Sequence, residues 1–109
     1  MATTAVGTDF YKLVATAGVP VALGLAATKF SSITFVGCKS AKTNNTDTVY
    51  IRFAGGTGWL PLAPGNYSTW DSKDSRPFTA AMFELDSVTN GDGVLAITQN
   101  PPNTYDGPA

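Results

Sequence analysis

Short alternating segments separated by glycine and proline constrain this chain most. The clearest segment, "VYIRF", alternates apolar Val49, Ile51 and Phe53 with Tyr50 and Arg52, which is the two-residue period of a strand with one buried face. No stretch carries apolar residues at the spacing of a helix with capping residues at both ends. We therefore expect an all-β chain in which Val49, Ile51 and Phe53 point into the core.

Other segments show the same alternation or a short apolar run between turn residues. They are 21–26, 31–39, 59–62, 67–70, 80–88 and 93–99. The last two are separated by Asn90-Gly91, a pair that favours a type I′ turn, so we expect them to form a hairpin. About seven short strands with frequent turns predict a small antiparallel β-sandwich, jelly-roll or immunoglobulin-like.

A glycine cluster after the clearest strand has the composition of a phosphate-binding loop. Such a loop needs a following helix, whose N-terminal N–H groups bind the phosphate. Here Gly55, Gly56 and Gly58 are followed closely by Pro61 and Pro64, which prevent a helix of useful length. We therefore expect the cluster to be a turn between two strands.

The two ends of the chain differ from the middle. Met1–Thr8 is small and polar, and Asn100–Ala109 is too rich in proline for the interior of a sheet. Both are expected to be extended arms. The resulting division is an N-terminal arm with leading strands (1–28), a sandwich body (29–99) and a C-terminal tail (100–109), within one domain.

Charge and residue chemistry exclude several classes of function. The 109 residues carry a net charge of −1, which excludes broad electrostatic attraction to nucleic acid or to an anionic membrane. Gly18, Pro20 and Gly24 interrupt the apolar N-terminal run, so no membrane helix is expected. The chain has no histidine, and its one cysteine, Cys38, lies in an apolar strand where burial is expected. The commonest catalytic bases and nucleophiles are therefore missing, and we expect neither an enzyme nor a cofactor.

Two acidic loops have side chains that calcium could bind. Asp86, Asn90 and Asp92 lie close in sequence, but their spacing misses the EF-hand pattern. In the other loop, "WDSKDSRP", the aspartates stand beside Lys73 and Arg76, which would neutralise them. Turn formation is the preferred interpretation of both loops.

Three aromatic residues gather in the turn-rich middle of the chain. Trp59, Tyr67 and Trp70 could stack on sugars or anchor a protein interface if they are exposed. They could equally close the core, because a small domain needs large side chains to do so. The second interpretation is favoured, and both remain open at this point.

The order of these segments resembles the small β-sandwich domains of tailed-phage virion proteins. The similarity rests on "SSITFVGCKSA", "DTVYIRFA", "LPLAPG" and "GDGVLAIT", which together span roughly Ser31 to Gln99. The chain departs from that pattern between Gly65 and Phe78, and it adds about thirty residues before the matching region.

The resemblance implies a structural protein of the virion. The first expectation is a capsid decoration (cement) protein on the capsid exterior, which binds the assembled major capsid protein and self-associates, with a trimer favoured. Alternatives are a head-fibre base or tail-associated protein, and a carbohydrate-binding module. The residues expected to contact partners are Val6, Phe10, Tyr11, Trp59, Tyr67 and Trp70.

Overall fold

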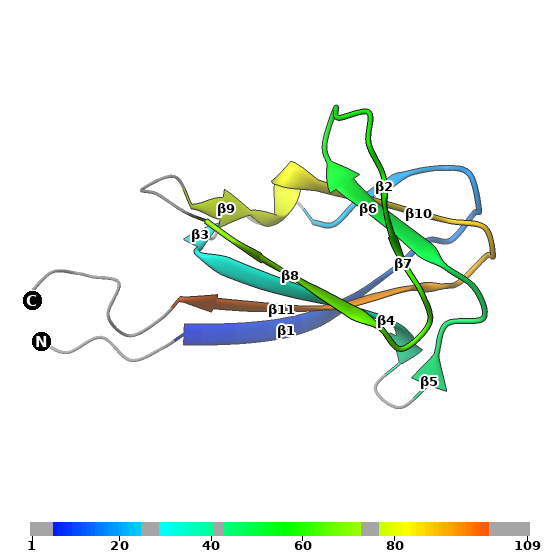
Figure 1. The fold of residues 1–109 in the computed structure, drawn as a ribbon, viewed down its shortest axis with the longest axis horizontal. Coiled ribbons are helices and arrows are strands. Elements are labelled where there is room, and N and C mark those ends of the chain that lie inside the picture. The colour runs from blue at the N-terminus through cyan, green and yellow to red at the C-terminus, as the bar shows by residue number, and fades with distance from the viewer. Residues whose placement is uncertain (1–5, 25–28, 41–42, 73–76, 101–109) are drawn as a thin grey trace, which may run out of the picture.

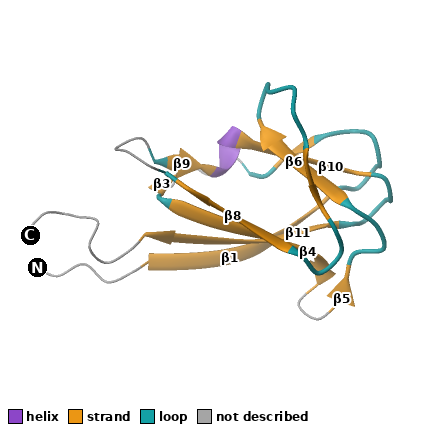
Figure 2. Cartoon of the chain, viewed as in Figure 1, coloured by secondary structure: helices purple, strands orange, loops and turns teal. Residues whose placement is uncertain are grey.

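The computed structural model describes residues 6–24, 29–40, 43–72 and 77–100, and it confirms an all-β chain (Figures 1 and 2). All strand pairs in these ranges are antiparallel. The elements are β1 (Val6–Leu13), β2 (Val21–Ala22), β3 (Lys29–Phe30), β4 (Ser32–Ser40), β5 (Thr43–Asn44), β6 (Val49–Phe53), β7 (Leu60–Leu62), β8 (Tyr67–Asp71), β9 (Phe78–Thr79), the 3₁₀ turn η1 (Ala80–Met82), β10 (Phe83–Ser87) and β11 (Gly93–Asn100).

The strands pair as nested layers of one long hairpin. The outermost pair is β1 with β11, followed inward by β2 with β10, β4 with β8, and β6 with β7. Pairing of β4 with β11 and of β6 with β10 joins these layers into two sheets, while β3 and β9 form a separate two-stranded ladder. The five-stranded sheet runs β1-β11-β4, with β5 and β8 both on β4, and the four-stranded sheet runs β2-β10-β6-β7. This rolled hairpin is the jelly-roll arrangement, which decides between the two sandwich types expected from the sequence.

The expected hairpin between the last two strands is wrong. β10 belongs to the four-stranded sheet and β11 to the five-stranded sheet, so the connecting turn crosses from one layer to the other. Asn90 cannot take part in a type I′ turn, because only glycines have positive φ among the described residues. The crossing is held instead by backbone bonds to the end of β1: Gly91 N–H donates to the Val14 carbonyl, and Val14 N–H donates to the Asp92 carbonyl.

The interpretation of Met1–Thr8 as an arm is wrong for the part that the structure describes. Residues 6–8 belong to β1, which pairs with β11 along its whole length, from Val6 opposite Asn100 to Leu13 opposite Gly93. β1 begins and β11 ends at the same end of the sandwich (Figure 1). The expectation that the C-terminal tail begins at Asn100 is wrong, because Asn100 belongs to β11 and pairs with Val6. The rest of that tail, 101–109, and the first five residues lie outside the described residues.

The core lies between the two sheets and confirms the alternation of β4 and β6. Ile33 and Phe35 of β4 are fully buried, as are Val49 and Ile51 of β6, while Cys38 is buried at 8% exposure. The complete cluster is Val14, Leu23, Phe30, Ile33, Phe35, Val49, Ile51, Leu62, Ala80, Phe83, Leu85, Val94 and Ala96.

Phe53 differs from the expectation of a buried core residue. It is 45% exposed, because it ends β6 where the four-stranded sheet reaches its rim. Its ring still points toward the core side, with its centre 5.1 Å from that of Phe83 and 5.0 Å from that of Trp70. The direction of the side chain is therefore as predicted and its burial is not.

The glycine cluster after β6 forms a turn, as predicted. Gly55 adopts a φ of 81°, and Gly56 N–H donates to the Phe53 carbonyl at 2.8 Å. The chain then continues through described residues into β7 without a helix, so the cluster is not followed by a helix N-terminus.

The difference between the two phenylalanines gives a stability test. Phe83→Ala should lower the free energy of unfolding by about 3–5 kcal/mol, since it empties a fully buried site. Phe53→Ala should lower it by only about 1–2 kcal/mol, because nearly half of the side chain already faces solvent. Urea unfolding of both variants measures this, and equal losses would contradict the burial described here.

Candidate functional site

A row of apolar side chains crosses the outer face of the five-stranded sheet. The register places Tyr11 of β1 opposite Leu95 of β11, Leu95 opposite Val36 of β4, and Val36 opposite Tyr67 of β8. Tyr11 is 40% exposed and Tyr67 is 73% exposed, while Val36 and Leu95 are half-buried between them. We call these four residues the apolar row.

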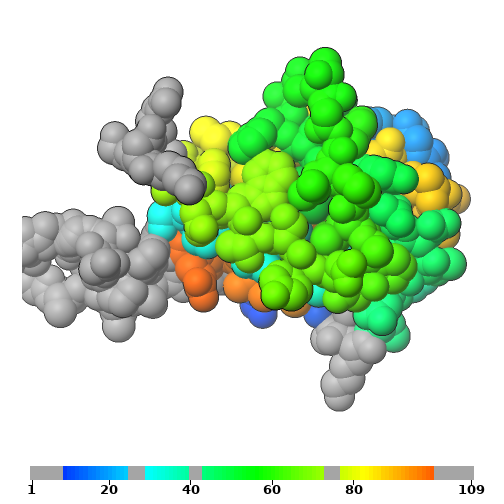
Figure 3. Space-filling view, in the orientation of Figure 1, coloured from blue at the N-terminus to red at the C-terminus, as the bar shows by residue number. Residues whose placement is uncertain are grey.

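Strand alternation explains why this row faces outward. Phe35 and Ala96, each next to a member of the row in sequence, point into the core, so Val36 and Leu95 must point away from it. The adjacent row consists of Asp9, Ile97, Thr34 and Thr69, and its one charge is at Asp9 on the β1 edge. Thr34 and Thr69 are joined by a hydroxyl–hydroxyl bond of 2.9 Å. β8 forms one edge of this sheet and lies at the surface in Figure 3 (yellow-green).

The Tyr11 phenol stays neutral on this face. Desolvation raises its pKa above the ordinary value, and the nearby Cys38 and Asp9 raise it further. Since an unperturbed tyrosine titrates near pH 10, the hydroxyl keeps its proton at neutral pH. The rim of the apolar row can therefore donate a hydrogen bond without carrying a charge.

The outer face of the four-stranded sheet is different in character. Arg52 of β6 lies over the Trp59 ring at 4.1 Å from its centre and donates to Glu84 of β10 at 2.8 Å. In the next row Tyr50 is opposite Asp86. This face therefore combines aromatic rings with charged groups.

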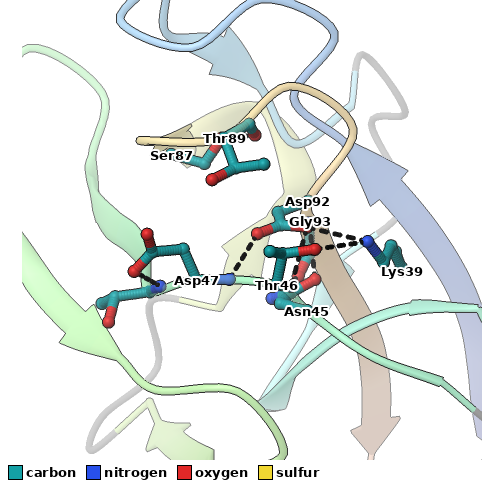
Figure 4. A network of polar contacts seen from close by, with 9 residues as sticks. Lys39, Asn45, Thr46, Asp47, Ser87, Thr89, Asp92 and Gly93 are labelled. Atoms are coloured by element: carbon teal, nitrogen blue, oxygen red, sulfur yellow. Dashed lines mark hydrogen bonds and ion pairs between the residues drawn. The ribbon is translucent and has the colours of Figure 1, made fainter.

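A buried polar junction ties the two layers together at one end (Figure 4). The Asp92 carboxylate has no exposure to solvent. Its Oδ1 accepts from Thr46 N–H at 3.1 Å and its Oδ2 from Asp47 N–H at 2.7 Å. Lys39 Nζ lies 3.5 Å from Oδ1 and donates to Thr46 Oγ1 at 2.7 Å. The burial of this charge is thus compensated by two backbone donors and one cation.

The next residues complete the junction. Asn45 Nδ2 donates to the Gly93 carbonyl at 2.8 Å, and Gly93 N–H donates to Asn45 Oδ1 at 3.0 Å. Gly93 has no room for a side chain, because a Cβ there would lie 2.1 Å from the Lys12 carbonyl oxygen. The junction is a structural clamp, because its polar groups hydrogen-bond to one another and to the backbone.

The loop pattern predicts instead that Asp92 is a turn former, with calcium binding as the alternative. Its partners lie some 45 residues earlier in the chain, at Thr46 and Asp47, so no local pattern identifies them. The only local hint is the glycine on either side, which lets the backbone pack closely around a buried carboxylate.

Two residues expected to contact partners point into the core. Phe10 is opposite Ala96 on the inner face and packs against the core cluster. Trp70 is opposite Ile33, and its ring centre lies 6.0 Å from Phe35 and 5.4 Å from Phe83. The expected partner contacts of both residues are corrected by the same cause, since alternation places these large rings inward. For Trp70 this confirms the favoured interpretation, in which the aromatic closes the core.

Tyr11, Tyr67 and Trp59 have outward-facing side chains, but they lie on two different sheets. Tyr11 and Tyr67 share the apolar row, although β1 and β8 lie at opposite edges of their sheet. Trp59 lies on the outer face of the other sheet. Val6 lies in β1, and its side chain is outside the described residues. The three middle aromatics, Trp59, Tyr67 and Trp70, therefore do not form one platform.

The first acidic loop directs its oxygens to separate partners. Asp86 Oδ1 and Asn90 Oδ1 accept from backbone N–H groups of the loop before β2, and Asp92 belongs to the junction. Within the described residues, no three acidic, cysteine or histidine side chains are grouped so as to hold a metal ion. The second acidic loop, at 73–76, lies outside the described residues. No helix in the described part of the chain is long and apolar enough to span a membrane.

The junction predicts that Asp92 and Asp47, two acids close together in the fold, contribute very differently to the free energy of unfolding. Asp92→Asn should lower the free energy of unfolding by about 2–4 kcal/mol, because one backbone N–H would then face an amide that cannot accept from it. The matched control is Asp47→Asn, an exposed side chain that accepts from Thr48 N–H and from no other described group, and it should change stability by about 0.5 kcal/mol or less. Similar small effects at both positions, measured by urea unfolding, would show that the junction is not a clamp.

No family model, no curated protein and no solved structure matches the chain. Function is therefore inferred from the chemistry of the two outer sheet faces.

Proposed function

We propose that this protein is a structural virion protein of a tailed phage, a decoration protein that binds the assembled major capsid lattice from outside. The observation that carries the proposal is the apolar row, Tyr11, Leu95, Val36 and Tyr67, left uncovered on a sheet face of low charge. The resemblance of residues 31–99 to virion β-sandwich domains supplies the class of partner.

The face suits docking because it is already ordered. Ladder hydrogen bonds hold β11 and β4 on both sides, and they hold the edge strands β1 and β8, which carry the two tyrosines, on one side. Paired strands lose little conformational freedom on binding, whereas a flexible arm loses about 1–2 kcal/mol per residue for its backbone. Covering an exposed aromatic side chain contributes roughly 1.5–3 kcal/mol when its burial is complete. The two exposed tyrosines at the ends of the row are therefore its main sources of binding free energy.

The fold supports the proposal by analogy only. Jelly rolls occur in viral capsid domains and also in lectin domains, and a fold does not by itself imply a function. The proposed effect on the shell follows from mass action, since a protein that binds the assembled lattice and not free subunits stabilises the lattice. Self-association, with a trimer favoured, remains part of the proposal.

Surface substitutions test which face docks. Tyr67→Glu and Tyr11→Glu place a charge at the ends of the apolar row without opening the core, because both side chains are substantially exposed. Each should weaken binding to shells stripped of this protein by about tenfold or more.

The matched control is Trp59→Ala on the opposite outer face. It should leave shell occupancy unchanged, as measured by co-sedimentation and by shell melting temperature. Full occupancy by both tyrosine variants would reject the apolar row as the docking surface. If wild-type protein does not bind shells at all, the decoration function itself is rejected.

A further inference from the structure

The outer face of the four-stranded sheet has a hollow that shell docking does not use. It is lined by Tyr50 of β6, Trp59 just before β7, and Asp86 of β10, and it is an open depression of about 170 Å³. A cavity of roughly 150 Å³ admits a single six-membered ring. The hollow therefore has the size of one small cyclic ligand, and it lies on the opposite side of the sandwich from the apolar row.

The backbone of Tyr50 and the ring of Trp59 are held in place before any ligand arrives. Tyr50 lies between Asp86 and Pro61 in the sheet, on the face that alternates with buried Val49 and Ile51. The Arg52 guanidinium lies over the Trp59 ring, and Arg52 is itself held by Glu84 at 2.8 Å. A ring held in this way loses little freedom on binding.

Asp86 gives the hollow one oriented acceptor. Its Oδ1 accepts from Gly18 N–H at 2.9 Å and from Ser87 N–H at 2.8 Å, which fixes the carboxylate. Among the described residues, no group donates to its Oδ2. That oxygen can accept a hydrogen bond from a ligand hydroxyl.

We infer that this hollow is a binding site for a neutral sugar ring. The C–H face of the sugar packs on Trp59 and Tyr50, and a ring hydroxyl donates to Asp86 Oδ2. Aromatic surface with a few fixed polar groups is the general composition of a small-molecule site. The site lies beyond the proposed shell-binding function and does not depend on it.

A quaternary ammonium group is the alternative ligand, because such cations bind aromatic rings beside a carboxylate. The cation–π contact of the Trp59 ring is already made, since the Arg52 guanidinium lies 4.1 Å from the ring centre. A sugar needs no second cation on that ring, and for this reason it is the ligand proposed.

An NMR titration of the free, full-length chain tests the inference. The probes are glucose, galactose, mannose and N-acetylglucosamine, each added to roughly 100 mM because one ring in an open hollow binds in the millimolar range. At least one sugar should shift the Trp59 indole N–H resonance in a saturable way and leave that of Trp70 in place. Tetramethylammonium, as the cation probe, should not shift it.

Variants separate the hollow from other aromatic surface. Trp59→Ala and Asp86→Asn should each weaken sugar binding about tenfold or more, while Trp59→Phe should keep part of the affinity. In these variants binding is measured from the backbone amide resonances of Tyr50 and of β10, the strand that carries Asp86. Tyr67→Ala, an exposed aromatic on the other face, should leave it unchanged.

The inference is overturned if none of the four sugars shifts the Trp59 signal, if tetramethylammonium shifts it instead, or if Tyr67→Ala abolishes the effect. Because no shell is present in the titration, its outcome is independent of the docking test.

Discussion

The buried Asp92 carboxylate is the constraint on which the closure of the sandwich depends. The carboxylate accepts hydrogen bonds from the backbone N–H groups of Thr46 and Asp47 in the loop before β6. The backbone carbonyl of Asp92 accepts a hydrogen bond from Val14 N–H at the end of β1. Asn45 and Gly93 add a second pair of hydrogen bonds at the start of β11. One turn thereby joins the first strand, the middle loop and the last strand. A jelly roll, whose partners are remote in sequence, needs such a connection because local contacts cannot fix its register.

This closure leaves the two outer faces free for different uses. With the large rings turned inward, the five-stranded sheet presents the apolar row between Tyr11 and Tyr67, and the four-stranded sheet presents the Arg52–Trp59 stack beside Asp86. Because these faces lie on opposite sides of the sandwich, a molecule docked by the first would keep the second open to solvent. Docking and sugar binding are thus compatible proposals within one small domain.

Alternation predicts the central strands of this protein, because it records which face of a strand is buried. It does not predict β1, in which Asp9 and Lys12 put charges on both faces and hide the period. Nor does it predict strand partners: the role of Asp92 and the alignment of Tyr11 with Tyr67 both arise from pairing between distant segments. The sequence shows which aromatic residues are candidates for the surface, but only the strand register shows which of them lie on the same sheet face.

The most direct test of the proposed function is hydroxyl-radical footprinting of the protein, free and bound to shells assembled from the major capsid protein encoded in the same genome. Side-chain oxidation reports solvent access residue by residue and requires no substitution. The account predicts that Tyr11 and Tyr67 lose reactivity on the shell while Trp59 keeps the reactivity that it has in the free protein. Protection of Trp59 with both tyrosines still reactive would contradict it.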